Sequence, residues 1–305
     1  MIEAIGLTKR YGEKAAVNDL SFTVRAGQVT GFLGPNGAGK STTLRMLLGL
    51  DRPTSGTALI DGRPYASLTR PLHTVGALLD ASAFHPGRSA RSQLRAIALS
   101  NGIGAARVDT VLDEVGLSSV AGRRAGGFSL GMKQRLGIAA ALLGDPQLLI
   151  FDEPVNGLDP EGVHRIRTLM RDLAARGRTV FVSSHLMSEM QYTADHLVIV
   201  GRGRLIADKP LSDLIDSAAG THLTIRTLPA RRGELAAALE ALDARVETRA
   251  DDALAVRGTT PQEAGLLAHH RGIPLTELSI QRSTLEDAYM ALTDDAVEYR
   301  AKEAV

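Results

Sequence analysis

The 305-residue chain has no cysteine, which excludes disulfide bonds, thiolate catalysis and cysteine-ligated metal sites. It also has no excess of charge of either sign, since 35 lysine and arginine residues balance 34 aspartate and glutamate residues. Balanced charge argues against a basic field over the whole surface and leaves only a local basic patch open, so we expect no nucleic-acid partner. The absence of cysteine fits a reducing compartment such as the cytosol.

Long apolar runs are also missing. No stretch of 18 apolar residues occurs, and residues 1–4 lack the charged and apolar regions of a signal peptide. The longest apolar runs, such as residues 138–143, have the length of a core helix. We therefore expect that this chain does not span a bilayer, and that any action at a membrane requires another chain that does.

The most informative segment that is present runs from Gly34 to Ser41 and fits the pattern G-x-x-x-x-G-K-[ST]. Residues 29–33 before it read as a buried strand, and residues 40–48 after it have helical spacing. Glycines let backbone amides approach an anion at the start of a helix, whose dipole favours negative charge. The pattern predicts a loop that binds nucleotide phosphates, formed by Gly34, Pro35, Asn36, Gly37, Ala38, Gly39, Lys40, Ser41 and Thr42.

Side chains with distinct roles complete this predicted site. Lys40 would reach the β- and γ-phosphates, and the Ser41 hydroxyl would bind Mg²⁺. Residues 147–151 form a second apolar strand that ends in Asp152 and Glu153. Asp152 suits Mg²⁺, directly or through water, because that ion prefers oxygen ligands. Glu153 is placed to polarise the attacking water as a general base.

The pattern of elements predicts two domains. Residues 1–215 alternate strands and helices, which predicts an α/β domain with a helical subdomain at about 88–143. Residues 208–221 are expected to form a linker, because they are interrupted by proline, serine and glycine. Residues 216–305 follow the order βαββαβ with a final helix, which predicts a small α+β domain of ferredoxin-like type.

These motifs, with four others, resemble the nucleotide-binding subunits of ABC transporters over residues 1 to about 210. Residues 128–135, FSLGMKQR, resemble the family signature, and residues 156–159, NGLD, resemble the D-loop that follows the carboxylates. His185 resembles the switch histidine after the next strand. Tyr11, in the sequence RYG, resembles the aromatic residue that stacks on adenine.

The resemblance implies a P-loop ATPase that binds ATP and Mg²⁺ and works as a dimer. Ser129 and Gly131 would contact the γ-phosphate of ATP held by a second nucleotide-binding subunit, expected to be an identical chain. Asp159 would couple the two sites across that interface, and His185 would hydrogen bond to the γ-phosphate and help to position water. The catalytic residues would be Lys40, Glu153 and His185.

The chain departs from the family pattern in two places. Leu130 replaces a glycine of the common signature and Met132 a glutamine, but Ser129 and Gly131 remain, so we expect activity. Asp80 aligns with the glutamine that in the family reaches Mg²⁺ and senses the membrane partner. Aspartate keeps an oxygen that can bind metal but has a shorter reach. Asp80 therefore either acts on the metal, directly or through water, or has lost this role.

The signature and residues 283–293, STLEDAYMALT, resemble the drug- and antibiotic-resistance ATPases of the daunorubicin and bacitracin type. This resemblance implies the ATPase subunit of an exporter. It would lie in the cytoplasm on the inner face of the cell membrane and drive a separate integral-membrane subunit. The implied cargo is an antibiotic, a peptide or a lipid-like compound.

Two alternatives remain. The first is a soluble ABC ATPase that acts on a ribosome or on DNA, but the single nucleotide domain, the missing long coiled coil and the balanced charge disfavour it. The second is a nucleotide-binding regulator without hydrolysis, which is disfavoured because Glu153 and His185 are both present.

Overall fold

The computed structural model describes residues 1–217, 222–249, 251–281 and 284–293. Over the described residues, the chain divides into two compact units, one of Met1–Leu211 with Thr293 and one of Ser212–Leu292. The division between the two units falls after residue 211. Within the described ranges, no helix is long and apolar enough to cross a membrane.

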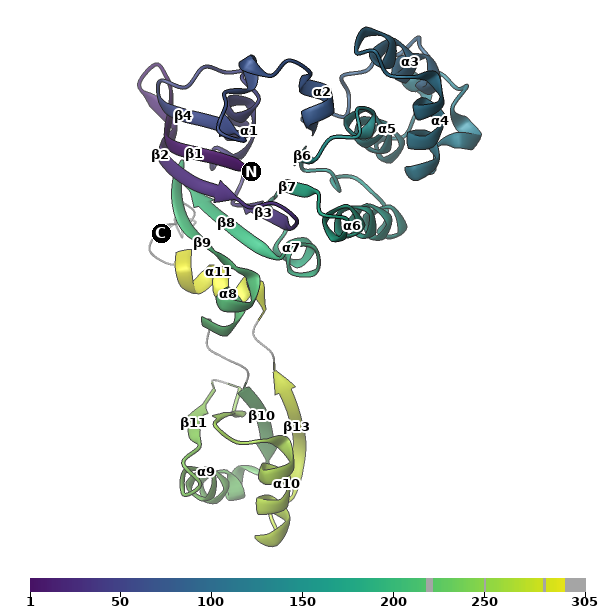
Figure 1. The fold of residues 1–305 in the computed structure, drawn as a ribbon. Coiled ribbons are helices and arrows are strands. Elements are labelled where there is room, and N and C mark those ends of the chain that lie inside the picture. The colour runs from purple at the N-terminus through teal and green to yellow at the C-terminus, as the bar shows by residue number, and fades with distance from the viewer. Residues whose placement is uncertain (218–221, 250, 282–283, 294–305) are drawn as a thin grey trace, which may run out of the picture. The chain divides into compact units, whose positions relative to one another are not determined.

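The first unit is built on a six-stranded sheet with the order β5-β6-β7-β3-β8-β9 (Figure 1). Its first five strands in this order are parallel, and β9 pairs antiparallel with β8. The interior strands β3 and β7 are buried along their whole length, as expected for a parallel sheet that is covered on both faces. The strands are β3 (Val29–Leu33), β5 (Val75–Leu78), β6 (Leu148–Asp152), β7 (Thr179–Ser184), β8 (His196–Gly201) and β9 (Arg204–Pro210).

An antiparallel sheet with the order β2-β1-β4 packs against one face of this parallel sheet. Phe22, Phe32 and Phe181 join the two sheets, with ring centroids 5.2 to 5.6 Å apart. Helix α1 (Lys40–Leu47) contributes the fully buried Leu44 to the same core. The strands of the antiparallel sheet are β1 (Ile2–Tyr11), β2 (Lys14–Val24) and β4 (Ser55–Ile60).

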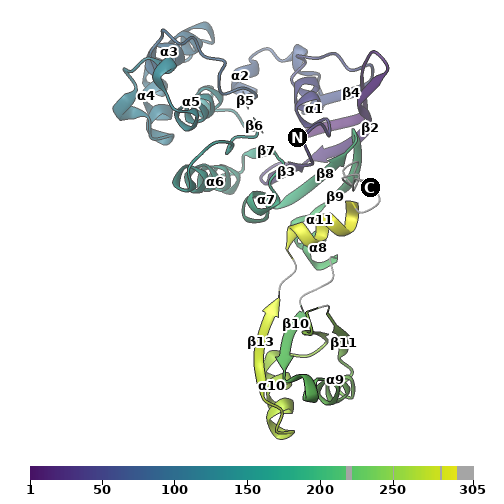
Figure 2. The same cartoon turned by 180° about the vertical axis from the view of Figure 1, so that it is seen from behind.

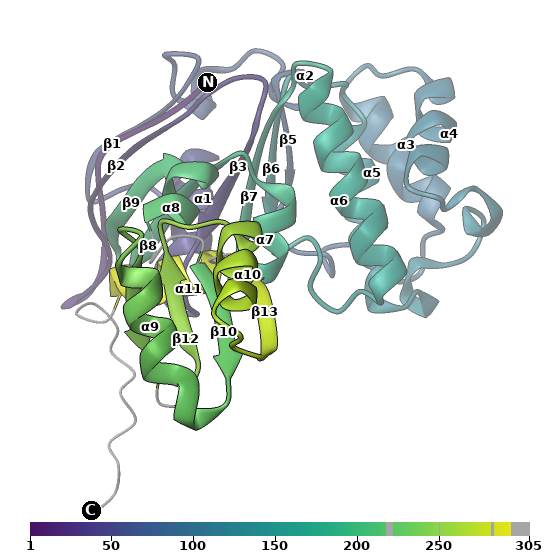
Figure 3. The same cartoon turned by 90° about the horizontal axis from the view of Figure 1, so that it is seen from below.

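Helices α6 (Pro160–Ala175) and α7 (Met187–Thr193) pack against β7 and β3, on the face away from α1 (Figure 3). A group of helices forms a subdomain at one edge of the parallel sheet (Figure 2). Its α5 lies against β5, a strand that the sequence analysis had not assigned. The subdomain and the short helix before β5 comprise α2 (Pro71–Thr74), α3 (Ala90–Ser100), α4 (Ala105–Glu114) and α5 (Leu130–Leu142).

The second unit confirms the order βαββαβ that the sequence predicted. Its sheet has the order β11-β12-β10-β13 with antiparallel neighbours, and α9 and α10 cover one face (Figure 3). Its core includes the buried Leu223, Leu239 and Val256. The elements are α8 (Leu211–Ser217), β10 (His222–Thr227), α9 (Arg232–Glu240), β11 (Arg245–Thr248), β12 (Leu254–Arg257), α10 (Pro261–His270), β13 (Leu275–Gln281) and α11 (Leu285–Thr293).

The expected linker at 208–221 is wrong in part. Strand β9 extends to Pro210, and α8 follows directly at Leu211–Ser217. Residues 218–221 lie outside the described residues. Leu211 and Leu214 are three residues apart and share one helix face, and Leu214 is fully buried. This apolar pair favours a helix over an irregular linker.

Candidate nucleotide-binding site

The loop of residues 34–39 connects the buried strand β3 to the start of α1. Gly37 and Gly39 have φ angles of 81° and 98°, a left-handed conformation that side chains rarely adopt. At Gly39 a Cβ atom would also lie 2.5 Å from the carbonyl oxygen of Ala16. The tight turn therefore depends on glycine, and it aims the first amides of α1 toward one point, where an anion is favoured.

Lys40 is the first residue of α1, and its side chain is only 6% exposed. Its Nζ donates hydrogen bonds to the carbonyl oxygens of Gly34 at 2.7 Å and Pro35 at 3.3 Å. Burial lowers the pKa of Lys40, and the nearby carboxylates of Glu153 and Asp152 only partly oppose this effect. The cation is therefore held in a place that disfavours its charge, which suits a group that binds a phosphate.

A hollow of about 610 Å³ opens beside this loop. It brings Tyr11 from the end of β1 together with the loop and the start of α1. Lys14 and Arg202 also line it, although the sequence analysis singled out neither. The lining residues are Tyr11, Lys14, Ala15, Ala16, Asn36, Gly37, Gly39, Lys40, Ser41, Thr42 and Arg202.

Tyr11 is half exposed, and neighbouring charges fix its position. Its hydroxyl donates to Oδ2 of Asp51 at 3.2 Å, and Nζ of Lys9 lies 5.1 Å from its ring centroid. Arg45 holds Asp51 by two hydrogen bonds of 2.7 and 3.1 Å, which lowers the pKa of this carboxyl group. The aromatic ring is thus held at the mouth of the hollow.

Arg202 lies in the tight turn between β8 and β9, with a φ angle of 49°. The amide of the next residue, Gly203, donates to the carbonyl oxygen of Ala38 at 3.2 Å. Its carbonyl oxygen accepts a hydrogen bond of 2.8 Å from the amide of Asn18. These bonds fasten the turn to the phosphate loop, so the exposed guanidinium of Arg202 remains beside the hollow.

The predicted carboxylates meet the phosphate loop where β6 and β7 end. The Ser183 hydroxyl donates to Oδ1 of Asp152 and accepts a hydrogen bond of 3.0 Å from the amide of Glu153. Oε1 of Glu153 lies 3.5 Å from Nζ of Lys40, and Oε2 lies 2.9 Å from Nδ1 of His185. Four predicted site residues therefore lie in one cluster, which consists of Lys40, Asp152, Glu153 and His185.

The oxygens of Ser41 and Asp152 fit a Mg²⁺ ion bound jointly by protein and substrate. Ser41 lies at the start of α1 and Asp152 at the end of β6. Over the described ranges, no three histidine, cysteine, aspartate or glutamate residues form a metal-binding group. Mg²⁺ commonly takes one or two protein oxygens and completes its shell with water and phosphates, so this sparse set suits it.

Asp80 makes its hydrogen bonds with its own loop. Its Oδ1 accepts from the amide and from the hydroxyl of Ser82, both at 2.7 Å, and these bonds lower the pKa of the carboxyl group. Because β5 and β6 pair in parallel with Leu78 opposite Phe151, Asp80 follows the strand end beside Asp152. A role for Asp80 at the metal therefore stays a prediction.

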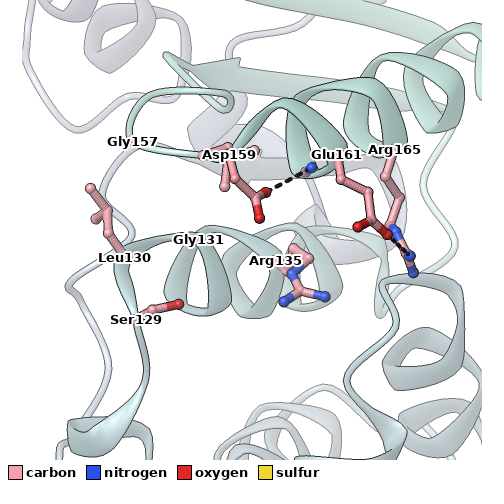
Figure 4. Close-up of a pocket in the computed structure, with 10 residues that line it drawn as sticks. Ser129, Leu130, Gly131, Arg135, Gly157, Asp159, Glu161 and Arg165 are labelled. Carbon is pink, nitrogen blue, oxygen red and sulfur yellow. Dashed lines mark hydrogen bonds and ion pairs between the residues drawn. The ribbon is translucent and has the colours of Figure 1, made fainter.

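A separate pocket of about 360 Å³ holds the other predicted residues, Ser129, Gly131 and Asp159 (Figure 4). Ser129 begins α5 and accepts a hydrogen bond from the amide of Met132 at 3.2 Å. Asp159 begins α6 and accepts from the amide of Gly162 at 2.9 Å. Two helix N-termini thus border one pocket, whose lining residues are Ser129, Leu130, Gly131, Arg135, Gly157, Leu158, Asp159, Glu161, Gly162 and Arg165.

The unusual Leu130 of the signature packs on the loop that precedes α6. A Cβ atom added to Gly157 would lie 2.2 Å from Cδ2 of Leu130, and one added to Gly131 would lie 2.9 Å from Cδ2 of Leu158. Each leucine thus occupies the space above a glycine of the other segment. Leu130 thus contacts the loop before α6, although about half of the residue stays exposed at 52%.

A glycine-rich loop that opens a helix, beside a carboxylate pair at the end of a buried strand, defines a P-loop nucleotide-binding protein. Residues 17–156 match the family described as "ABC transporter". Residues 221–286, in the second unit, match a "Domain of unknown function (DUF8746)".

Comparisons with known proteins give the same family. The chain is 44% identical to the bacitracin transport ATP-binding protein BcrA of Bacillus licheniformis, over 70% of this chain and 71% of that protein. It is 36% identical to the Nod factor export ATP-binding protein I of Burkholderia orbicola, over 96% of both chains. A solved "ATP binding subunit of ABC transporter" superposes with a TM-score of 0.64 at 29% identity, over 70% of this chain and 91% of that one. The chain belongs to the ATP-binding proteins of ABC transporters.

Proposed function

We propose that this chain is the ATP-hydrolysing subunit of an exporter and drives a separate integral-membrane subunit. The observation that carries the proposal is the convergence of Lys40, Glu153 and His185 beside the phosphate loop. The named relatives transport bacitracin and export Nod factor, which supports an antibiotic, peptide or lipid-like cargo. Such a subunit would lie in the cytoplasm on the inner face of the cell membrane.

The cluster supplies the groups that one copy of the chain would contribute to hydrolysis. Glu153 accepts a proton from the attacking water, and His185, which hydrogen bonds to its carboxylate, keeps that carboxylate oriented. Lys40 stabilises negative charge on the β- and γ-phosphates, and the amides at the start of α1 do the same. Mg²⁺, held by Ser41 and Asp152, would neutralise charge on the same phosphates.

Two copies of the chain are needed for a complete site in this proposal. Lys40 and Ser41 line one hollow, whereas Ser129 and Gly131 line a different one. The second pocket would therefore receive the γ-phosphate of ATP bound by the other copy, where the N-terminus of α5 favours the negative charge. Binding of ATP would then join the two copies.

The substitution Glu153→Gln tests the enzymatic part. It keeps the size of the side chain but removes the base, so we expect hydrolysis to fall by about 100-fold or more. Because ATP is then bound but not cleaved, the variant should elute as an ATP-dependent dimer in size-exclusion chromatography. Glu240→Gln, an exposed change in α9, is the control. A monomer with ATP, or undiminished hydrolysis, would refute this part.

The transport part needs a different experiment. The tagged chain is purified from gently solubilised cells, and its stoichiometric partners are identified. A multi-span membrane protein without a phosphate loop of its own is the expected partner. Recovery with ribosomes or DNA instead would refute the exporter and favour the alternative of an ABC ATPase with a non-membrane partner.

A further inference from the structure

Gln134 is a residue with a buried side-chain amide in α5, the helix that begins at the signature sequence. The sequence motifs gave it no catalytic or binding role. It lies in α5, one turn after Ser129 and Gly131, and is 7% exposed. Its Nε2 donates a hydrogen bond of 3.3 Å to the carbonyl oxygen of Glu153, the general base. Its Oε1 is buried without a partner among the described residues. A buried amide oxygen without a partner costs free energy, so its presence in a folded protein calls for an explanation.

The backbone that Gln134 contacts is held in an uncommon conformation. Glu153 has a φ angle of 49°, in the left-handed region where a residue with a side chain is disfavoured. Such conformations persist where the surroundings fix them, and they concentrate at functional sites. Here the amide of Glu153 donates to Ser183, and its carbonyl oxygen accepts from the amide of Asn156 at 3.1 Å as well as from Gln134.

These backbone bonds decide where the carboxylate points. Ser183 belongs to β7, and Asn156 belongs to the loop that follows Glu153. Gln134 therefore makes the hydrogen bond that connects the backbone of Glu153 to α5. With the backbone held this way, Oε1 and Oε2 of Glu153 lie near Lys40 and His185. A rotation of this peptide would swing the carboxylate away from both partners.

The start of α5 and the loop after Glu153 also pack closely together (Figure 4). Leu130 lies over Gly157, and Leu158 lies over Gly131, as described above. A displacement of α5 would therefore move the loop and, through Gln134, the carbonyl group of Glu153.

We propose that Gln134 is a positioning residue, which sets the general base Glu153 according to the position of the signature helix α5. The inference rests on the proposed ATPase function and adds a residue to it. In a dimer, α5 would face the ATP bound by the partner copy. Gln134 would then align the base of one site when the other site is occupied.

The substitution Gln134→Leu removes the donated hydrogen bond and keeps the approximate volume of the side chain. We expect kcat to fall by about tenfold to a hundredfold, because a small displacement of a catalytic group has effects of this size. The affinity for a fluorescent ATP analogue and the midpoint of thermal unfolding should stay near those of the parent. Gln93→Leu is the control, since Gln93 lies in α3 and also has a buried Oε1 without a partner in the described chain.

A double-mutant cycle distinguishes positioning from general damage. If Gln134 acts through Glu153, then Gln134→Leu should cause no further loss in the Glu153→Gln background. Should the leucine variant not fold, Gln134→Glu keeps the size and replaces the donor by an acceptor. Equal kcat values for the Gln134 variant and the parent would overturn the inference, as would multiplied losses in the double variant. Absence of hydrolysis by the parent would instead overturn the proposed function, and this inference with it.

Discussion

Nδ1 of His185 lies 2.9 Å from Oε2 of Glu153, although 32 positions separate the two residues in the chain. A carboxylate only accepts hydrogen bonds, so Nδ1 carries the proton in this pair. The ring can therefore donate to a phosphate oxygen through Nε2 only when both nitrogens are protonated. In the proposed mechanism, His185 would then link Glu153 to the phosphate that is cleaved.

The substitution His185→Ala should remove this link. We expect kcat to fall by about 100-fold to 10,000-fold, the range typical of a positioned acid or base, with little change in ATP affinity. Steady-state phosphate release and equilibrium binding of a fluorescent ATP analogue measure the two quantities. His269→Ala, an exposed change in α10, serves as the control. A parallel loss of ATP affinity would assign His185 to binding instead.

The substitution Lys40→Met should change ATP affinity and thermal stability in opposite directions. Loss of a charge-assisted hydrogen bond of about 1.5–3 kcal/mol predicts an ATP affinity that is roughly 10-fold to 150-fold lower. The nucleotide-free variant should nevertheless unfold at a higher temperature, because burial disfavours the charge of Lys40.

This stability difference should depend on pH. Below the lowered pKa, Lys40 is charged in both the folded and unfolded states, and the folded protein bears the full cost of burying the charge. As the pH rises through the lowered pKa, the folded parent loses the proton and this cost declines. The advantage of Lys40→Met should therefore shrink with increasing pH, and thermal unfolding over a pH series measures it. An advantage that grows with pH would contradict the lowered pKa.

Arg202 should contribute to ATP binding because its turn is fastened to the phosphate loop. An exposed cation near phosphates is worth about 1 kcal/mol, so Arg202→Ala should weaken ATP binding roughly fivefold. The effect should diminish at high salt, since exposed charges are screened. Arg204→Ala changes an exposed arginine of the same hairpin and is the control. Equal ATP affinities of Arg202→Ala and Arg204→Ala would show that Arg202 does not contribute to ATP binding.

Asp80 can be tested by two substitutions with different consequences. Asp80→Asn keeps an oxygen for the hydrogen bonds to Ser82 but removes the charge, whereas Asp80→Ala removes both. If the carboxylate acts on the metal, both variants should need roughly 3-fold to 10-fold more Mg²⁺ for half-maximal hydrolysis. If it only shapes the loop, Asp80→Asn should behave like the parent. Titration of Mg²⁺ at saturating ATP distinguishes the two cases.

Local sequence was enough for the fold class and the short motifs. Residues 34–42 are contiguous, and their glycines meet a local conformational need, so the phosphate loop could be read directly. The alternation of elements was also strong enough to predict the ferredoxin-like order of the second unit. The linker predicted at 208–221 is wrong in part, because proline and serine also occur at the start of helices and α8 occupies Leu211–Ser217.

The sequence by itself determined that the chain has a phosphate loop, a carboxylate pair and a candidate switch histidine, because each is a short motif of adjacent residues. Only the tertiary structure placed Lys40, Glu153 and His185 in contact, since strand pairing brings β3, β6 and β7 side by side. It also decided that Arg202 lines the nucleotide hollow and that Gln134 bonds to Glu153. Such contacts join residues far apart in the chain, and no local pattern encodes the packing that brings them together.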